Sequence, residues 1–185
     1  MQDRPLPRPT NIAKVVFYNN TWKDTEEYLE SDECIKERWK CVYGSPVPFK
    51  KEIGMGEILL VFEMNNEINQ LMGFGIISNI VYNDRKYRIY TGLNAYMNFN
   101  IYKGRYRISR DEFIAYQGIL DDDPGQTAEK LLMDTEHMLF CGRTHHKRGV
   151  GIRIMSDARM PVKIKCQFYR IVLDILKQRP QKDLA

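Results

Sequence analysis

EILLVFEM, residues 57–64, is the most apolar run in the chain and predicts a central strand that is buried on both faces. The asparagines at positions 65–66 predict a turn after it. In the following stretch, residues 69–82, Gly73 and Gly75 stand among large apolar residues. Glycine at such places indicates a bent or bulged strand, where the missing Cβ lets another backbone approach. The fold is therefore expected to be built around a sheet.

Shorter patterns on either side predict the other elements. Strands are expected at residues 14–18, 40–46 and 151–155. Helical spacing covers residues 22–39, with a split at Ser31–Asp32, and short helices are expected at 110–120 and 127–139. Pro161 begins an amphipathic helix that runs to about Gln178. We predict one α+β domain at residues 13–180, a curved or barrel-like mixed β-sheet with surrounding helices, the C-terminal helix closing one side. An extended, proline-spaced basic arm at residues 1–12 precedes it, and a tail at 181–185 follows.

Composition limits the class of protein. The chain has 185 residues, 43% of them hydrophobic, and a formal net charge of +4, which permits a nucleic-acid or phosphate partner without requiring one. The first 13 residues contain no apolar targeting segment, and the apolar runs are far shorter than the roughly 20 residues that span a bilayer. We expect no membrane insertion. The four cysteines are scattered, so reduced thiols and an intracellular location are expected.

Aromatic and cationic residues interleave through residues 82–110, with Asp84 as the one acid before Arg110. On a strand, the period of two would place Lys103, Arg105 and Arg107 on one face. Tyr102 and Tyr106 would then lie on the opposite face. Cations beside aromatic rings are typical of single-stranded nucleic-acid binding, through phosphate neutralisation and base stacking. The alternative is a solvated edge strand whose tyrosines fill the core.

A second basic region, FCGRTHHKRGVGIR, occupies residues 140–153. Its glycines would let backbone N–H groups approach a phosphate, and its cations would supply charge. The anion-site candidates are Arg143, His146, Lys147, Arg148, Gly149 and Gly151. The alternative is a basic loop that contacts the protein's own acidic surface.

The same region contains weaker candidates for metal binding and catalysis. Cys141, His145 and His146 could bind zinc if Cys34, Cys41 or Cys166 completed the set, but a C-x2-C partner is missing. A thiolate nucleophile at Cys141 and general acid–base catalysis by His145 or His146 are the enzymatic alternatives, with His146 as the weak catalytic candidate. We expect no metal and no cofactor.

Five sequence blocks carry a resemblance to a known set of proteins. They are CVYGSP (41–46), FEMNN (62–66), GFGIISN (73–79), YKGRYRISR (102–110) and LFCGRTHHKRGVGI (139–152). Together they resemble uncharacterised proteins of large nucleocytoplasmic DNA viruses, over roughly residues 40–154. In that set one histidine precedes Lys-Arg-Gly-x-Gly; His146 matches it and His145 is extra. The resemblance implies a viral protein in the host cytoplasm or the virion, and no particular activity.

A fainter likeness concerns the fold alone. EILLVFEM followed by GFGIIS is similar to the core hairpin of PUA/EVE-like domains, small mixed β-barrels that bind RNA or modified bases.

The function expected from these patterns is a non-enzymatic nucleic-acid-binding module, with RNA ahead of DNA. A basic, aromatic-lined groove would join the two basic regions. One alternative is a structural virion or assembly protein that binds viral or host proteins. Another is a nuclease or phosphotransfer enzyme that uses His146.

Overall fold

A five-stranded mixed sheet organises the computed structural model, which describes residues 8–49, 53–118, 125–141, 145–147, 149–156 and 160–179. The strand order is β6-β4-β3-β1-β7. β1 (Asn11–Phe17) runs parallel to β3 (Ile58–Asn65). β4 (Gln70–Ser78), β6 (Tyr106–Ser109) and β7 (Ile152–Ile154) join by antiparallel pairing. The central apolar strand is therefore confirmed, as is the mixed α+β class.

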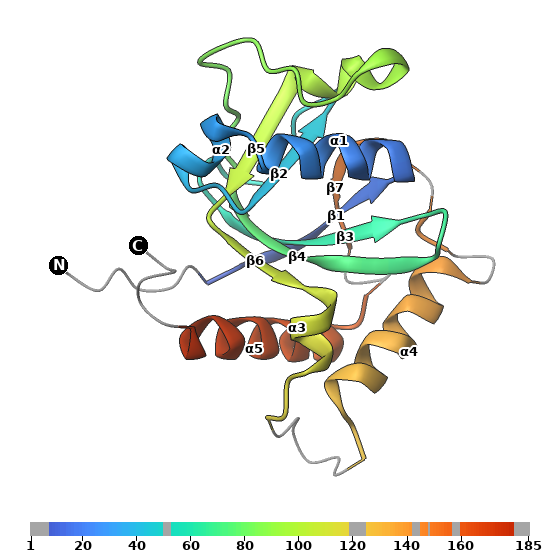
Figure 1. Ribbon diagram of the computed structural model, residues 1–185. Helices are drawn as coiled ribbons and strands as arrows, with labels where there is room; N and C mark the ends of the chain where they lie inside the picture. Colours follow the sequence, from blue (N-terminus) through green and yellow to red (C-terminus); the bar gives the residue numbers. More distant parts are fainter. Residues whose placement is uncertain are drawn as a thin grey trace, which may run out of the picture.

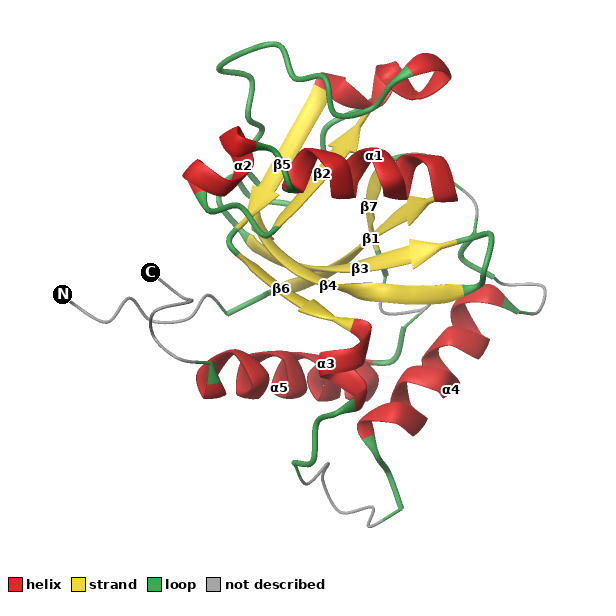
Figure 2. Ribbon diagram, in the orientation of Figure 1, coloured by secondary structure: helices red, strands yellow, loops and turns green. Residues whose placement is uncertain are grey.

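Two layers cover the two faces of this sheet (Figures 1 and 2). The upper layer contains α1 (Asn19–Leu29), α2 (Asp32–Glu37), the 3-10 segment η1 (Gly92–Phe99), and an antiparallel ribbon of β2 (Cys41–Ser45) and β5 (Asn100–Gly104). The lower layer contains α3 (Arg110–Ile114), α4 (Ala128–Phe140) and α5 (Val162–Gln178).

Each layer encloses its own hydrophobic core, because alternate residues of a strand point to opposite faces. In β3, Leu60 and Phe62 face the lower core, while Leu59 and Val61 face the upper one. In the lower core, the Phe168 ring of α5 lies 4.7 Å from the Phe62 ring, centroid to centroid. Removing such a buried ring costs about 3–5 kcal/mol.

Local capping explains where the short helices begin and end. The Ser31 side chain accepts a hydrogen bond from the Cys34 N–H, so a second helix starts at the expected split. α2 stops at Arg38, which adopts the left-handed conformation. Ser109 and Glu112 form a reciprocal capping box at the start of α3. α3 ends at Ile114, earlier than the expected helix of residues 110–120.

β4 is bulged, as its glycines predicted. Glu63 pairs with Gly73 while Met64 pairs with Leu71, which leaves Met72 as the extra residue. A Cβ on Gly73 would lie 2.6 Å from the Ile108 carbonyl oxygen of β6, so the close backbone approach is confirmed.

Three expectations about the fold need correction. The described strands form no closed barrel, because β6 and β7 are the two free ends of the five-stranded sheet. Residues 103–107 are not one strand: the chain leaves the ribbon at Gly104 and enters the other sheet at Tyr106. β1 begins at Asn11, so the last two residues of the expected arm belong to the sheet. Residues 1–7 of that arm and the tail at 181–185 lie outside the described residues.

Candidate functional site

A buried carboxylate, Glu63, lies on the central strand at its upper face. Its side chain accepts hydrogen bonds from the Tyr43 hydroxyl (2.7 Å) and from the Arg107 Nε (3.0 Å) and Nη2 (2.7 Å). Glu63 is 2% exposed, and the Arg107 side chain 22%. Buried ion pairs seldom add net stability over apolar residues of similar volume. A buried ion pair of this kind is therefore a candidate for a role in binding or catalysis.

The glycines of β4 make room for this cluster. A Cβ on Gly75 would overlap the Tyr43 hydroxyl oxygen, and one on Gly73 would lie 2.8 Å from Glu63 Oε2. The residue type at these two positions thus allows the ribbon to approach the sheet closely enough for Tyr43 to reach Glu63.

Burial determines the protonation of the groups around Glu63. It raises the pKa of the Cys41 thiol to about 12 and holds the pKa of the Tyr43 phenol well above its ordinary value. Burial alone would lower the pKa of Arg107, but the Glu63 carboxylate outweighs it and holds that pKa above its ordinary value. At neutral pH the cluster is one ion pair beside a neutral thiol and a neutral phenol. Cys41 is therefore poorly suited to act as a nucleophile.

A cavity of about 110 Å³ adjoins the cluster, between α1 and the start of β2. The residues that line it are Trp22, Thr25, Glu26, Leu29, Lys40, Cys41, Val42, Tyr43, Glu63 and Arg107. We call this cavity the α1 pocket. Arg107 Cζ lies 5.5 Å from the Trp22 ring centroid, so the guanidinium is held between an aromatic ring and a carboxylate.

Two exposed cations lie side by side at this end of the ribbon. The backbone N–H of Lys40 donates a hydrogen bond to the Gly104 carbonyl oxygen (2.8 Å), which places Lys40 beside Arg105. Lys40 lines the α1 pocket, and the Arg105 guanidinium lies 5.3 Å from the Trp39 ring centroid. Neither Lys40 nor Arg105 has an ion-pair partner in the described part of the chain.

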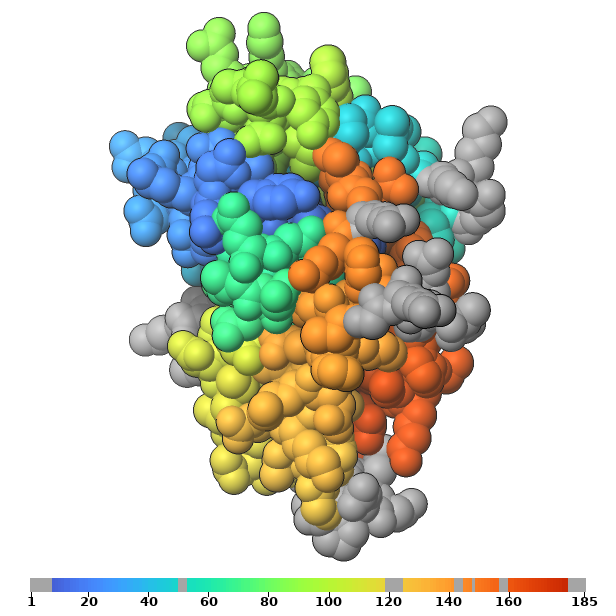
Figure 3. Space-filling view, turned by 90° about the vertical axis from the view of Figure 1, so that its right-hand side faces the viewer, coloured from blue at the N-terminus to red at the C-terminus, as the bar shows by residue number. Residues whose placement is uncertain are grey.

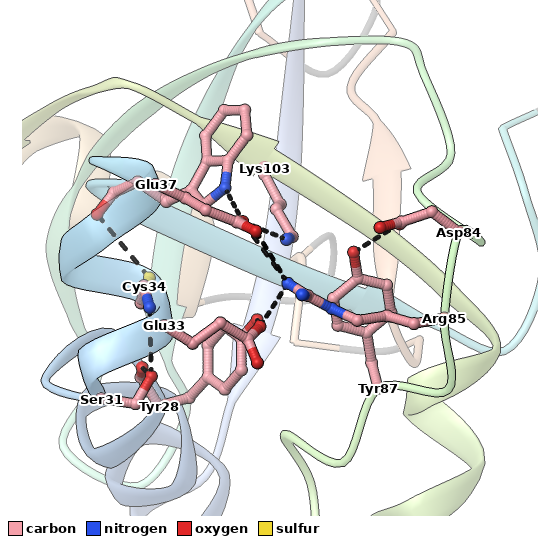
Figure 4. Close-up of polar contacts among 10 residues, drawn as sticks. Tyr28, Ser31, Glu33, Cys34, Glu37, Asp84, Arg85, Tyr87 and Lys103 are labelled. Atoms are coloured by element: carbon pink, nitrogen blue, oxygen red, sulfur yellow. Dashed lines mark hydrogen bonds and ion pairs between the residues drawn. The ribbon is translucent and has the colours of Figure 1, made fainter.

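Lys103, by contrast, is enclosed. Its ammonium lies 3.2 Å from a Glu37 carboxylate oxygen, and 4.5 Å and 5.4 Å from the ring centroids of Tyr87 and Trp39 (Figure 4). Tyr82 adds a third ring at 5.3 Å. Only 1% of the Lys103 side chain is exposed, so the expectation that it contacts phosphates is wrong.

The surroundings of Lys103 fasten a loop to α2. Figure 4 shows the Arg85 guanidinium between Glu33 and Glu37, with ion pairs to both carboxylates. Two contacts lower the pKa of the Glu37 carboxyl. The larger effect comes from the hydrogen bond of the Trp39 indole, and the Lys103 ammonium adds to it. Through these ion pairs, Arg85 and Lys103 stabilise the folded structure.

The two tyrosines expected to stack on bases face the protein interior. Tyr102 is fully buried, and its hydroxyl accepts a hydrogen bond from the Phe49 N–H (3.1 Å). Tyr106 is half-buried and packs against the lower core. Stacking by Tyr102 is therefore ruled out in this structure, because its ring has no exposed face. The alternative in which tyrosines fill the core describes this part of the chain.

In the second basic region, the backbone makes internal contacts. His146 is buried, its carbonyl oxygen accepts a hydrogen bond from the Lys14 ammonium, and its N–H donates to the Leu139 carbonyl (2.7 Å). The Lys147 carbonyl accepts from the Asn66 side chain (2.8 Å), which holds this region beside the β3–β4 turn (Figure 3). A buried imidazole is not presented to a substrate, so this geometry gives no support to catalysis by His146.

The glycines of that region serve packing and backbone conformation. Gly149 and Gly151 have φ values of 110° and 73°, which favour glycine. A Cβ on Gly151 would overlap the Ser45 hydroxyl oxygen, so this residue packs against the ribbon. Arg143 and Arg148 lie outside the described residues.

The two basic regions lie at opposite ends of β2. Gly151 packs against Ser45 at one end, while Lys40 and Arg105 adjoin Cys41 at the other. Four residue steps of about 3.3 Å separate these ends by roughly 13 Å. The two basic regions are therefore separated along the ribbon, and a single groove that joins them stays a prediction.

The residues expected to bind zinc do not form a metal site in the part of the chain that the structure describes. Cys141 is exposed, whereas Cys34 and Cys41 are buried. Within the described ranges, no three His, Cys, Asp or Glu side chains are grouped so that they could hold a metal ion.

Sequence reasoning missed the main members of this site: Glu63, Tyr43, Trp22 and Lys40. One signal was present, because Glu63 is an acid inside the most apolar run of the chain and precedes a glycine-bent strand. An acid at a buried strand position needs a partner.

Comparisons with protein-family models, curated proteins and solved structures gave no match. Among the helices that the structure describes, none is both long enough and apolar enough to cross a bilayer.

Proposed function

We propose that this chain is a non-enzymatic module that binds single-stranded nucleic acid, RNA ahead of DNA, at the mouth of the α1 pocket. The observation that carries the proposal is the pair Lys40 and Arg105: two adjacent, exposed cations without ion-pair partners among the described residues, next to a pocket that contains Trp22. Cations supply the phosphate contacts that dominate nucleic-acid affinity, and aromatic side chains add base contacts.

The ion pairs explain why these cations, and not their neighbours, are assigned to phosphate. Lys103 and Arg107 are neutralised by Glu37 and Glu63. A cation that already has a carboxylate partner gains little from a phosphate, because the first contact must be given up.

The viral origin and the PUA/EVE-like relationship belong to the same proposal. Their support is the sequence resemblance, and the antiparallel β3–β4 pair is consistent with the second of them.

The proposal is tested by fluorescence anisotropy with a labelled single-stranded RNA between 50 and 200 mM salt. A plot of log K against log salt has a negative slope, and each phosphate contact on a single strand contributes about 0.7 to its magnitude. The Lys40→Ala/Arg105→Ala variant should therefore have a slope that is smaller in magnitude by about 1.4. Lys130→Ala/Lys163→Ala is the matched control, because both lysines are exposed on the lower layer. Equal slopes for the two double variants would reject this site.

A protein interface is the second candidate, and one observation favours it. η1 exposes three large apolar side chains: Leu93 (94%), Phe99 (72%) and Tyr96 (41%). The segment forms the top of the molecule in Figure 3. Exposed apolar patches often mark protein contacts. Light scattering after size-exclusion chromatography distinguishes the candidates: a concentration-dependent mass that Leu93→Ser/Phe99→Ser abolishes supports assembly, and a constant monomer mass argues against self-assembly.

A further inference from the structure

We infer that the α1 pocket holds one unpaired pyrimidine base of the bound strand. The inference rests on the proposed function and specifies the ligand of the same site. It is carried by the size of the pocket, by the hydrogen-bonding groups left in its wall, and by the position of Lys40 at its mouth.

Size restricts the ligand to a single ring. The pocket measures about 110 Å³. A closed cavity of about 150 Å³ holds benzene, whereas drug-sized ligands use about 300–1,000 Å³. One six-membered ring fits if its point of attachment remains at the open side. The two fused rings of a purine do not fit.

Several hydrogen-bonding groups in the wall already have partners within the protein. Both Glu63 oxygens already accept hydrogen bonds, from Tyr43 and from Arg107. The Thr25 hydroxyl donates to the Thr21 carbonyl (2.9 Å), and the Cys41 thiol is directed to the Tyr106 carbonyl (3.6 Å).

The wall groups without a hydrogen bond to the described residues are the donors of Trp22, Lys40 and Arg107 and one acceptor, the exposed Glu26 carboxylate. Arg107 uses Nε and Nη2 for Glu63, and its Nη1 makes no hydrogen bond to the described residues. A guanidinium nitrogen can only donate. It therefore requires an acceptor on the ligand, which is a carbonyl oxygen in uracil and cytosine and only a ring nitrogen in adenine.

The mouth of the pocket suits the rest of a nucleotide. Lys40 lines the pocket and is exposed, with Arg105 beside it. A base inside the pocket would leave its sugar and phosphates next to these cations. The base must be unpaired, because extracting it from a duplex costs several kcal/mol of stacking and pairing.

The test compares three labelled strands of equal length and charge: oligouridine, oligoadenosine and an abasic strand. Oligouridine should bind about 10-fold more tightly than the abasic strand, since one stacked base contributes that order of affinity. Leu29→Phe narrows the pocket and should reduce the affinity for oligouridine to the abasic level, with abasic binding unchanged. Leu93→Phe makes the same change on the exposed η1 segment and should alter neither.

A second measurement covers the case in which Leu29→Phe does not fold. The chain has two tryptophans, Trp22 and Trp39, so Trp39→Phe leaves Trp22 as the single indole reporter. Uridine should quench the fluorescence of that variant and adenosine should not. If all three strands bind equally, or if both nucleosides quench alike, the base assignment is wrong while the phosphate site stands. If none of the strands binds, the proposed function itself is wrong.

Discussion

At the scale of single residues, Glu63 is the unusual choice, since every other position from 59 to 64 in β3 is apolar and buried. Its charge is tolerated because the Arg107 guanidinium and the Tyr43 hydroxyl together satisfy both oxygens. This arrangement makes each member dependent on the others: removal of one partner leaves the remaining charge buried and unpaired.

We expect Glu63→Gln to destabilise the protein by about 3 kcal/mol, because it leaves Arg107 without its counter-charge. Urea unfolding measures the change. Glu27→Gln is the matched control: Glu27 pairs with Lys23 at 3.6 Å on an exposed surface, where the effect should stay below about 0.5 kcal/mol. The double variant Glu63→Leu/Arg107→Met should be more stable than Glu63→Gln alone. Equal losses for Glu63→Gln and Glu27→Gln would show that the pair is not coupled as described.

At the scale of elements, Gly75 determines how closely the β2–β5 ribbon packs on the sheet. We expect Gly75→Ala to cost about 1–3 kcal/mol, because its Cβ would overlap the Tyr43 hydroxyl oxygen. Gly54→Ala is the control, since the atoms nearest to a Cβ there belong to the flexible Glu57 side chain, the first at 3.2 Å. Thermal unfolding compares the two variants. An unchanged Tm for Gly75→Ala would mean that the ribbon can shift without cost.

The elements differ in how far the sequence could predict them. β3, the bulge of β4 and the split at Ser31–Asp32 follow from local patterns: an apolar run, two glycines and a Ser-Asp pair. The error at residues 103–107 has a different origin. Gly104 pairs with Cys41, whereas Tyr106 pairs with Ile76, and this choice between distant partners leaves no mark on the alternating pattern.

The same reason explains the partial success at the candidate site. Arg107 was singled out for its charge, but its role depends on Glu63, which lies 44 residues away in sequence. Lys103 was singled out for the same charge and is enclosed by α2 and the preceding loop. Local sequence shows where cations occur, and only the tertiary contacts show which of them remain available to a ligand.

At the scale of the whole molecule, both layers depend on the same two strands. β1 and β3 contribute alternate side chains to the two cores: Ile12 and Leu60 to the lower core, Ala13 and Leu59 to the upper one. Neither layer can lose its packing without exposing a face of these strands. We therefore expect the two layers to unfold together, as one cooperative unit.

Pulsed thiol labelling in urea tests this expectation, with one reporter in each core. Cys41 reports on the upper core, in a variant with the other three cysteines changed to serine. Ala128→Cys, with all four natural cysteines replaced, reports on the lower core, where Ala128 is 1% exposed. The urea midpoints of the two labelling curves should coincide, while exposed Cys166 in the natural protein should react without urea. If Cys41 became reactive at a urea concentration where the thiol of the Ala128→Cys variant stayed protected, the upper layer would open independently. The α1 pocket would then be part of a locally unstable region, in place of the rigid site that base recognition requires.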